Sequence, residues 1–483
     1  MSLREKTANS VKWNTIATVF TMVIGILQVA ILTRLLAKSD FGLIAIASMV
    51  IAFTDIFAEL GVTAALIHKQ DISQNEYSSV YWLNLTMSII ICGLTMLAAP
   101  LISTFYKEPS LTLIVKLLSL KIVFTAFGKM FQTIKTKNLE FNFISKVKIL
   151  TSIIGIVTST LLAYLGFGVM SLVYAQLLQI LVNQCIYAFA GMKQMRLRFH
   201  FSFFEVKDVL TIGGYQIGTQ IFDFIAARVD VFLIGRFFLM EQLGVYNIAK
   251  ELIVKPYTII NSITSNVFSA AFAKIQDNIN SVIANYSKLV KTVTMLSFPI
   301  YACLFIFADL IVGILYAPSF AEVAEFIRIM AVMGMCHSIT SQGAPVMIAM
   351  GRTDLGLRWT LVRILMSTCI MLFTASISIY AVAYGETVLA IISVFVYFLI
   401  VLRLLMKGLD LRRYLSIFSA ILLGVILLSC PFAIANMSFT VPVYFQFVML
   451  AVYGGLYFLF LQKFFNSELK EIMGLAFRRK SSK

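Results

Sequence analysis

The residues best equipped to do chemistry in this sequence are ionisable side chains that interrupt long apolar stretches. A charge at the centre of a membrane costs roughly 2.5 to 3.5 kcal/mol, so we expect these side chains to face a hydrated lumen or one another. A surplus of Lys and Arg favours an anionic ligand such as a pyrophosphate, because both supply charge and hydrogen-bond donors to phosphate oxygens. The basic members are Lys116, Lys121, Lys129, Arg228, Lys250, Lys255, Arg328 and Arg363. The acidic members are Asp55, Glu59, Asp223, Asp230, Glu251 and Asp309.

The position and spacing of these residues distinguish those that suit a structural or interfacial role from those that suit a lumen. Glu251 and Lys255 have i,i+4 spacing, which suits a structural ion pair as well as a substrate contact. Arg228 lies off the helix face that carries Asp223 and Asp230, and the sequence does not identify its partner. Four residues lie near the ends of apolar stretches, where snorkelling to the interface is sufficient. These four are Lys116, Lys129, Asp309 and Arg328.

The strongest candidates for a lumen-facing role lie on polar stripes, which are helix faces that carry several polar residues. Arg363 shares a helix face with Thr360, Ser367 and Thr374, and Lys121 shares one with Thr125, Gly128 and Gln132. Asp55 and Glu59 lie on a face with Ser48. We assign the cationic wall of the lumen to Lys121, Arg228, Lys250, Lys255 and Arg363. We assign its acids, which would suit coupling to a proton or a sodium ion, to Asp55, Glu59, Asp223, Asp230 and Glu251.

The elements that must position these residues are membrane-spanning helices. The chain has 483 residues, of which 60% are hydrophobic and 13% charged, whereas soluble domains carry roughly 25% charged residues. The first apolar stretch is longer than the core of a signal peptide, so we expect it to remain as a helix. The fold class is therefore all-α and polytopic, with about fourteen transmembrane helices. The spans are predicted near 13–35, 41–66, 78–99, 111–134, 144–165, 168–190, 208–235, 243–270, 288–312, 321–349, 356–381, 384–402, 414–435 and 441–462.

The basic residues outside the spans predict an orientation. If the N-terminus is cytoplasmic, 27 basic residues lie in cytoplasmic segments, among them Lys146 and Lys148, and only four lie outside. Those four are Arg34, Lys38, Lys107 and Arg236. This asymmetry predicts a multi-pass membrane protein with both termini in the cytoplasm. It also explains the formal charge of +16 without nucleic acid.

An internal repeat is indicated at an offset of 202 residues. Arg34 is followed by Gly42, and Arg236 is followed by Gly244, with seven residues between in each case. At the same offset, one polar stripe holds Asn14, Thr18, Thr21, Gly25 and Gln28. The other holds Gln216, Gln220, Asp223, Ala227 and Asp230. A displacement of six helices predicts two parallel repeats with a shared cleft.

The repeat divides the chain into five parts. We predict an N-lobe at 1–190, a basic and aromatic interfacial linker at 191–207 and a C-lobe at 208–406. An apolar helix pair at 407–463 and a basic cytoplasmic tail at 464–483 follow. The helix pair has no charged residue from Tyr414 to Gln462, which suits either plain lipid-facing helices or a groove for a long lipid tail.

Catalysis and cofactors are not indicated. The six cysteines lie singly in apolar stretches, which suggests neither disulfides nor a metal site. No Walker A, HExxH or nucleophile-elbow motif occurs, and the predicted outer loops are too short for the extracytoplasmic catalytic loop of a membrane polymerase or ligase. We therefore expect a protein that is not an enzyme and holds no cofactor.

The chain resembles the Wzx-type polysaccharide flippases, a branch of the MOP superfamily to which the MATE transporters also belong. The resemblance is carried by Ser10 to Asn14, Leu32 to Leu36 with Asp40 to Gly42, Glu59 to Gly61, and Met350 to Asp354. It implies two six-helix lobes, alternating access, and undecaprenyl-diphosphate-linked oligosaccharide as substrate. It also implies that the last two helices help to hold the lipid tail.

Membrane lipids, polysaccharide polymerases and glycosyltransferases are the expected partners.

The resemblance leaves related functions open. A MATE-type multidrug antiporter shares the fold but typically has twelve spans, and a lipid II flippase has fourteen.

Overall fold

The computed structural model describes residues 3–59, 73–192, 197–438, 442–466 and 468. Within these ranges every regular element is a helix, and none is a strand. Twelve spans among the described residues are long and apolar enough to cross a membrane. Two further helices, α8 (Phe203–Phe237) and α9 (Met240–Ile275), have the length but carry the intramembrane charges described above. The prediction of an all-α membrane protein with about fourteen transmembrane helices is confirmed.

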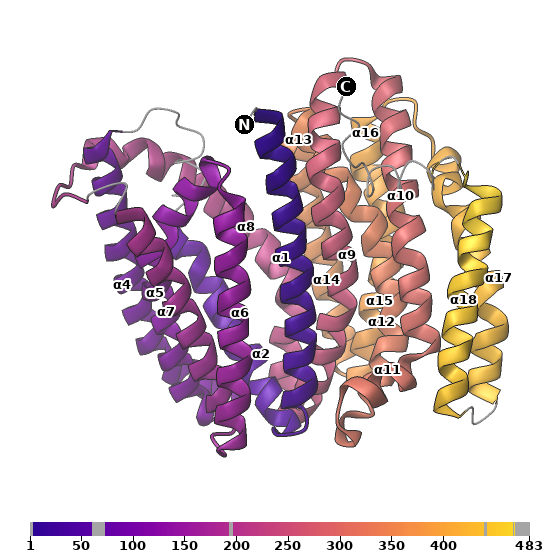
Figure 1. The fold of residues 1–483 in the computed structure, drawn as a ribbon, viewed down its shortest axis with the longest axis horizontal. Coiled ribbons are helices and arrows are strands. Elements are labelled where there is room, and N and C mark those ends of the chain that lie inside the picture. The colour runs from indigo at the N-terminus through magenta and orange to yellow at the C-terminus, as the bar shows by residue number, and fades with distance from the viewer. Residues whose placement is uncertain (1–2, 60–72, 193–196, 439–441, 467, 469–483) are drawn as a thin grey trace. The chain divides into compact units, whose positions relative to one another are not determined.

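Contacts group the described helices into two units (Figure 1). The N-terminal unit comprises Met1–Asn247 and Leu315–Phe320. It holds α8 and the start of α9 together with α1 (Leu3–Leu32), α2 (Lys38–Glu59), α4 (Gln74–Tyr106), α5 (Ser110–Lys137), α6 (Phe141–Tyr164) and α7 (Met170–Met192). This unit includes α8, which packs on α2 and α4. The predicted lobe boundaries at 190 and 207 stay a prediction.

The C-terminal unit comprises Ile248–Ile314 and Ala321–Lys483. Two of its spans are interrupted helices. One runs from α12 (Val323–Thr340) through η2 (Ser341–Gly343) to α13 (Ala344–Ala349), and the other from α15 (Ile379–Tyr397) through η3 (Phe398–Leu402) to α16 (Arg403–Leu405). The remaining helices are α10 (Ile279–Ile306), α11 (Ala308–Leu315), α14 (Thr353–Ala375), α17 (Leu411–Ser438) and α18 (Val443–Phe464).

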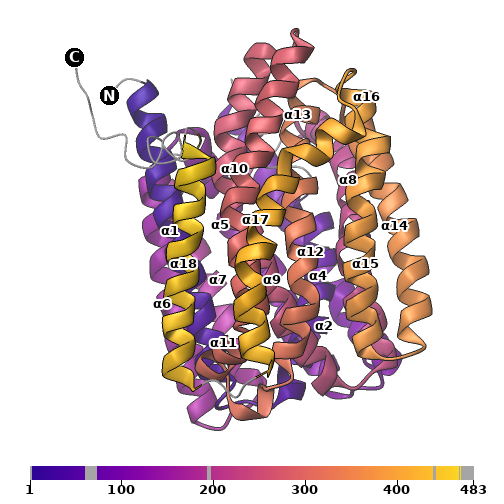
Figure 2. The same cartoon turned by 90° about the vertical axis from the view of Figure 1, so that its right-hand side faces the viewer.

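The last two helices pack as a pair against α10 (Figure 2). A Cβ at Gly424 of α17 would collide with the ring of Phe460 in α18, so this glycine permits close contact. The Tyr457 hydroxyl of α18 donates to the Met295 carbonyl at 2.8 Å, which ties the pair to α10. Large apolar side chains on both helices remain exposed, including Leu427 and Val448. The pair therefore presents an uncharged face outward.

The two glycines of the predicted repeat make reciprocal contacts in the N-terminal unit. A Cβ on Gly42 of α2 would collide with the backbone carbonyl of Met240, the first residue of α9. A Cβ on Gly244 of α9 would collide with the carbonyl of Lys38, the first residue of α2. Lys38 and Met240 are themselves 202 residues apart. The two helix starts therefore cross with local two-fold symmetry, and only glycine allows the backbones to approach this closely.

The two arginines of the repeat also play matching roles. Arg34 donates to the Leu315 carbonyl at 3.0 Å. Arg236 donates to the Phe105 carbonyl at 2.7 Å, and its guanidinium carbon lies 5.0 Å from the Phe105 ring centroid. Each arginine thus satisfies a carbonyl in the last turn of another helix, where intrahelical partners run out.

The described part of the linker is fastened to the start of α4. The Arg198 amide donates to Ser78 Oγ at 3.0 Å, and Trp82 Nε1 donates to the Arg198 carbonyl at 2.9 Å. Ser79 Oγ donates to Glu205 at 2.6 Å. This hydrogen bond, together with the neighbouring His200, holds the pKa of Glu205 below its usual value. The linker carries four exposed aromatic rings, as expected of a segment at a membrane interface: Phe199, Phe201, Phe203 and Phe204.

Candidate functional site

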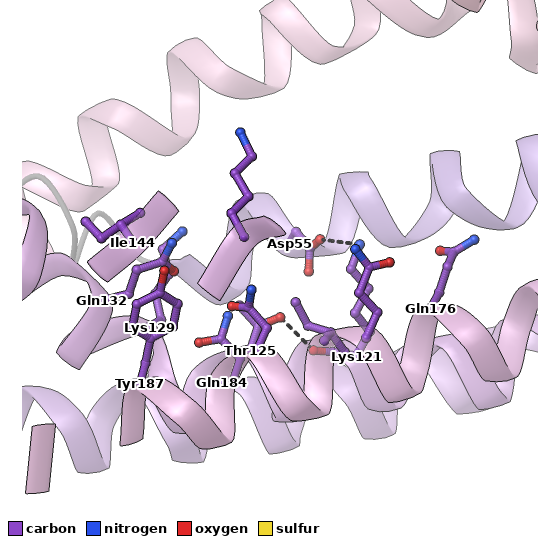
Figure 3. Close-up of a pocket in the computed structure, with 13 residues that line it drawn as sticks. Asp55, Lys121, Thr125, Lys129, Gln132, Ile144, Gln176, Gln184 and Tyr187 are labelled. Carbon is purple, nitrogen blue, oxygen red and sulfur yellow. Dashed lines mark hydrogen bonds and ion pairs between the residues drawn. The ribbon is translucent and has the colours of Figure 1, made fainter. Parts of the chain in front are cut away.

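A polar cavity of about 480 Å³ lies inside the N-terminal unit (Figure 3). Its walls come from α2, α5, α6 and α7. Three lysines and one carboxylate line it, together with five carboxamides and a few other side chains. The lining residues are Asp55, Lys121, Thr125, Lys129, Gln132, Ile144, Lys148, Gln176, Gln179, Ile180, Asn183, Gln184 and Tyr187.

The charges are distributed along the length of this cavity. Lys121 Nζ lies 3.9 Å from Asp55 Oδ2, and each of these side chains is one-third exposed. Lys121 lies toward one end, and Lys129 lies toward the other end beside Gln132 and Tyr187 (Figure 3). Because three cationic side chains face one acid, the cavity has an excess of positive charge and suits an anionic group.

Gln184 gives the cavity a buried polar group. Its side chain is 4% exposed, and its Oε1 has no hydrogen-bond partner among the described residues. Burying an amide oxygen without a partner costs roughly 1 to 3 kcal/mol, so such a group commonly serves a ligand or water. The position of Gln184 depends on Gly128 of α5, because a Cβ there would collide with Gln184. The close approach of α5 and α7 therefore directs this amide.

A second cavity of about 290 Å³ adjoins the first between α1, α6 and α7. The two share Lys148, Gln179 and Asn183. Its remaining lining residues are Thr21, Ile24, Gly25, Gln28, Thr151 and Ser152. Thr21, Gly25 and Gln28 belong to the polar stripe predicted for the first span, so that stripe faces a cavity.

Four of the residues that the sequence singled out line the first cavity. Lys121, Thr125 and Gln132 line one wall on α5, and Asp55 faces them from α2. Sequence reasoning assigned Lys129 to the membrane edge and Lys148 to a cytoplasmic loop, yet both line the cavity. α6 begins at Phe141 and therefore carries Lys148 in its second turn.

The α7 carboxamides were missed altogether, although their spacing carried a signal. Gln176, Gln179 and Asn183 are three and four residues apart, which places them on one helix face. On α6, Lys148, Thr151 and Ser152 make a similar polar group. A search for polar faces that includes uncharged amides would have found both.

Two predicted residues of the C-terminal unit lie near a histidine. Arg363 of α14 and Lys250 of α9 both act electrostatically on His337 of α12. Arg363 is half-buried, and its Nε is buried with no hydrogen-bond partner among the described residues. On the next turn of α9, Lys255 is half-buried, whereas Glu251 is exposed. This unit therefore holds a second group of cations.

The remaining predicted residues lie elsewhere. On α8, Arg228 and Asp223 are exposed, whereas Asp230 is buried and accepts a 2.7 Å hydrogen bond from the Tyr246 hydroxyl. Asp309 and Arg328, expected to reach the interface separately, form an ion pair with each other. The side chain of Glu59 lies outside the described residues.

Comparison with known proteins identifies the relatives of the chain. The family described as "Polysaccharide biosynthesis protein" matches residues 31–325. The lipopolysaccharide biosynthesis protein WzxC of Escherichia coli (strain K12) is 27% identical over 359 residues, covering 74% of this chain and 73% of that protein. The teichuronic acid biosynthesis protein TuaB of Bacillus subtilis (strain 168) is 26% identical over 358 residues, covering 74% of each.

Solved structures share the fold. The lipid II flippase MurJ in an inward closed conformation superposes with a TM-score of 0.76 at 14% identity, covering 94% of this chain and 99% of that one. An inward-facing multidrug resistance MATE transporter of the MOP superfamily gives a TM-score of 0.63 at 16% identity, covering 81% and 96%. At these identities the likeness establishes the fold and leaves the substrate to be argued from the cavity.

Proposed function

Because the chain belongs to the polysaccharide biosynthesis protein family, we propose that it carries a lipid-linked oligosaccharide across the bacterial cytoplasmic membrane. It is a multi-pass membrane protein and a transporter, and it catalyses no chemical reaction. The carrier lipid would be a polyprenyl diphosphate, whose head group is anionic. Both termini would lie in the cytoplasm, as the distribution of basic residues predicts.

The observation that carries this proposal is the cation-rich cavity of the N-terminal unit. Three lysines line this cavity against a single carboxylate, and a charge inside the membrane is costly unless an opposite charge or water compensates it. A diphosphate offers such compensation, and the carboxamides offer hydrogen bonds to the hydroxyls of a glycan. A cationic drug would be repelled by the same lysines, so the cavity does not favour a multidrug antiporter.

The Lys121–Asp55 pair suggests how the cavity responds to substrate. In the structure Asp55 Oδ2 lies 3.9 Å from Lys121 Nζ. An incoming phosphate would compete with Asp55 for this ammonium group. Displacement of Asp55 from Lys121 would take a positive charge away from its carboxylate and favour uptake of a proton or a sodium ion, which would link substrate binding to an ion gradient. Alternating access would then expose the cavity to the other side of the membrane.

The uncharged outer face of α17 and α18 suits the hydrocarbon tail. Neither helix carries a charge between Tyr414 and Gln462, and many of their large apolar side chains are exposed. A polyprenyl chain placed along this face would keep apolar contacts while the charged head occupies a hydrated cavity.

Reconstitution tests the proposal. Proteoliposomes containing the purified protein are loaded with a fluorescent undecaprenyl-diphosphate-linked glycan, and the fraction that reaches the opposite leaflet is measured by quenching. Protein-dependent translocation is expected, with no efflux of ethidium from the same vesicles. Ethidium efflux without glycolipid translocation would contradict the proposal. Rescue of cells depleted of their lipid II flippase, with no activity on other glycolipids, would redirect the substrate to lipid II.

A further inference from the structure

The smaller cavity between α1, α6 and α7 differs in chemistry from the cavity it adjoins. The larger cavity holds three lysines and an aspartate. The smaller one has a single charged side chain, Lys148, at the boundary that the two share. The rest of its wall consists of hydroxyls, carboxamides, Ile24 and the backbone at Gly25. Two neighbouring subsites with different preferences are therefore built into one unit.

The hydroxyls of the smaller cavity present acceptors. Thr21 Oγ1 donates its hydrogen to the Thr18 carbonyl, and Thr151 Oγ1 donates to the Val147 carbonyl at 3.0 Å. Ser152 Oγ donates to the Lys148 carbonyl at 2.7 Å. A hydroxyl whose hydrogen is used in this way has only lone pairs left to offer. Such groups disfavour a phosphate oxygen and favour a ligand that donates hydrogen bonds.

The carboxamides are held in place by neighbours. Gln28 Nε2 donates to Ser159 Oγ at 2.9 Å, and Asn183 Nδ2 donates to Thr151 Oγ1 at 3.2 Å. These contacts fix the orientation of both amides across α1, α6 and α7 without a ligand. Pre-organised polar groups lose less conformational entropy on binding, which is the arrangement expected of a recognition site.

Gly25 leaves the site open. It lies on α1 between Thr21 and Gln28, on the same helix face, and a Cβ built on it meets no atom within 4 Å. A glycine inside a helix lowers helix propensity by about 1 kcal/mol relative to alanine. Here the glycine has no close neighbour that would require its small size. Its effect is to leave open space in the wall of the smaller cavity.

From these observations we infer that the smaller cavity binds a neutral sugar ring of the glycan, while the larger cavity holds the charged group next to it. Sugar hydroxyls are donors as well as acceptors, so they can satisfy the oxygens of Thr21, Thr151 and Ser152. Lys148 lies where the two subsites meet and contacts the charged neighbour. The positive charge of Lys148 also disfavours a metal cation, the other ligand that an oxygen-lined cavity would attract. This inference rests on the proposed function and adds a preference for sugar to it.

Filling the cavity provides a specific test. Gly25→Leu places a side chain in the open space without meeting protein atoms at its Cβ. Gly93→Leu on α4 is the matched control, because Gly93 is also a mid-helix glycine with nothing within 4 Å and lines neither cavity. The probes are undecaprenyl diphosphate without sugar, and the same lipid carrying one glucose, galactose or N-acetylglucosamine. Binding to the detergent-purified full-length protein is measured by thermal shift and by competition with a fluorescent lipid.

The wild-type protein and Gly93→Leu are expected to bind at least one sugar-bearing lipid about tenfold more tightly than the bare diphosphate. Gly25→Leu should lose this preference and keep the affinity for the bare diphosphate. Ser152→Ala should reduce the preference for sugar-bearing lipids partly. Lys121→Ala should weaken all lipids alike. Equal binding of bare and sugar-bearing lipids by the wild-type protein would overturn the sugar subsite and leave the proposed function standing. Binding that depends on sodium and disappears in Gly25→Leu would also overturn it, in favour of a cation site. Failure of the wild-type protein to bind any of the lipids would overturn both.

Discussion

Lys121 of α5 and Asp55 of α2 face each other across the N-terminal cavity, with 3.9 Å between Nζ and Oδ2. Both side chains are one-third exposed, so water weakens their attraction and the pair is open to competition. The cavity therefore holds a lysine whose counter-ion a stronger anion can replace.

Changing the two partners separately should have opposite effects on binding. Lys121→Ala removes a charge-assisted contact and should weaken the affinity for undecaprenyl diphosphate by about tenfold. Asp55→Asn removes the competing acid and should strengthen it by a few fold, while slowing translocation. Isothermal titration with the detergent-solubilised lipid measures the affinity. Weaker binding in both variants would mean that the pair acts as a unit to shape the cavity.

The reciprocal glycine contacts at the start of α2 and α9 should be intolerant of any side chain. Gly42→Ala and Gly244→Ala each place a methyl group against a backbone carbonyl, and overpacking of this kind costs about 1 to 3 kcal/mol. Gly25→Ala has free space and should be neutral or stabilising. Melting followed by size-exclusion chromatography should therefore show lower Tm values for the first two variants only. Equal Tm values in all three would show that the two helix starts are farther apart than described.

Arg363 should contribute to activity at the expense of stability. Its Nε is buried with no hydrogen-bond partner among the described residues, so an apolar side chain of similar length removes a costly buried polar group. We expect Arg363→Met to keep or raise the Tm while lowering glycolipid translocation severalfold. Arg358→Met, at an exposed position on the same helix, is the control and should change neither. A large loss of Tm in Arg363→Met would indicate a structural role instead.

The attachment of the linker to α4 should depend on pH through Glu205. Its pKa is lowered by the hydrogen bond from Ser79 and by His200, so the carboxylate form stabilises the attachment. The contribution is present above the ordinary glutamate value and is lost as the pH falls through the lowered pKa of the folded state. In a Trp13→Phe, Trp359→Phe background, the fluorescence of Trp82, which stacks on Phe199 at 5.0 Å, reports the release. Glu205→Gln should abolish the transition; an unchanged transition would assign it to another group.

Much of the fold could be predicted from the hydropathy and motifs of the sequence. The length and apolarity of each span fix the helices, and the two Arg-x7-Gly motifs mark a real structural equivalence at Gly42 and Gly244. The first signal is local in sequence, because a span must satisfy its own backbone hydrogen bonds within the membrane. The second signal emerges when positions 202 residues apart are compared.

The pairing of residues on different helices could not be predicted from the sequence. Lys121 and Asp55 were each predicted to face a lumen, but nothing in one sequence indicates that they face each other. Asp309 and Arg328 were treated separately for the same reason, although they form an ion pair. Asp223 and Asp230 share a helix face by spacing, yet Asp230 is buried against Tyr246 and Asp223 is exposed. Tertiary packing, which periodicity does not specify, decides each of these outcomes.

The most direct test of the account removes the positive charge of the N-terminal cavity. Lys121, Lys129 and Lys148 are replaced together by Gln, and the control replaces Lys107, Lys116 and Lys146, which lie outside both cavities. Translocation of a fluorescent undecaprenyl-diphosphate-linked glycan is then measured in proteoliposomes containing equal amounts of folded protein. We expect the cavity variant to lose at least nine-tenths of the wild-type rate and the control to keep it. A cavity variant that translocates the glycolipid at the wild-type rate would contradict the account.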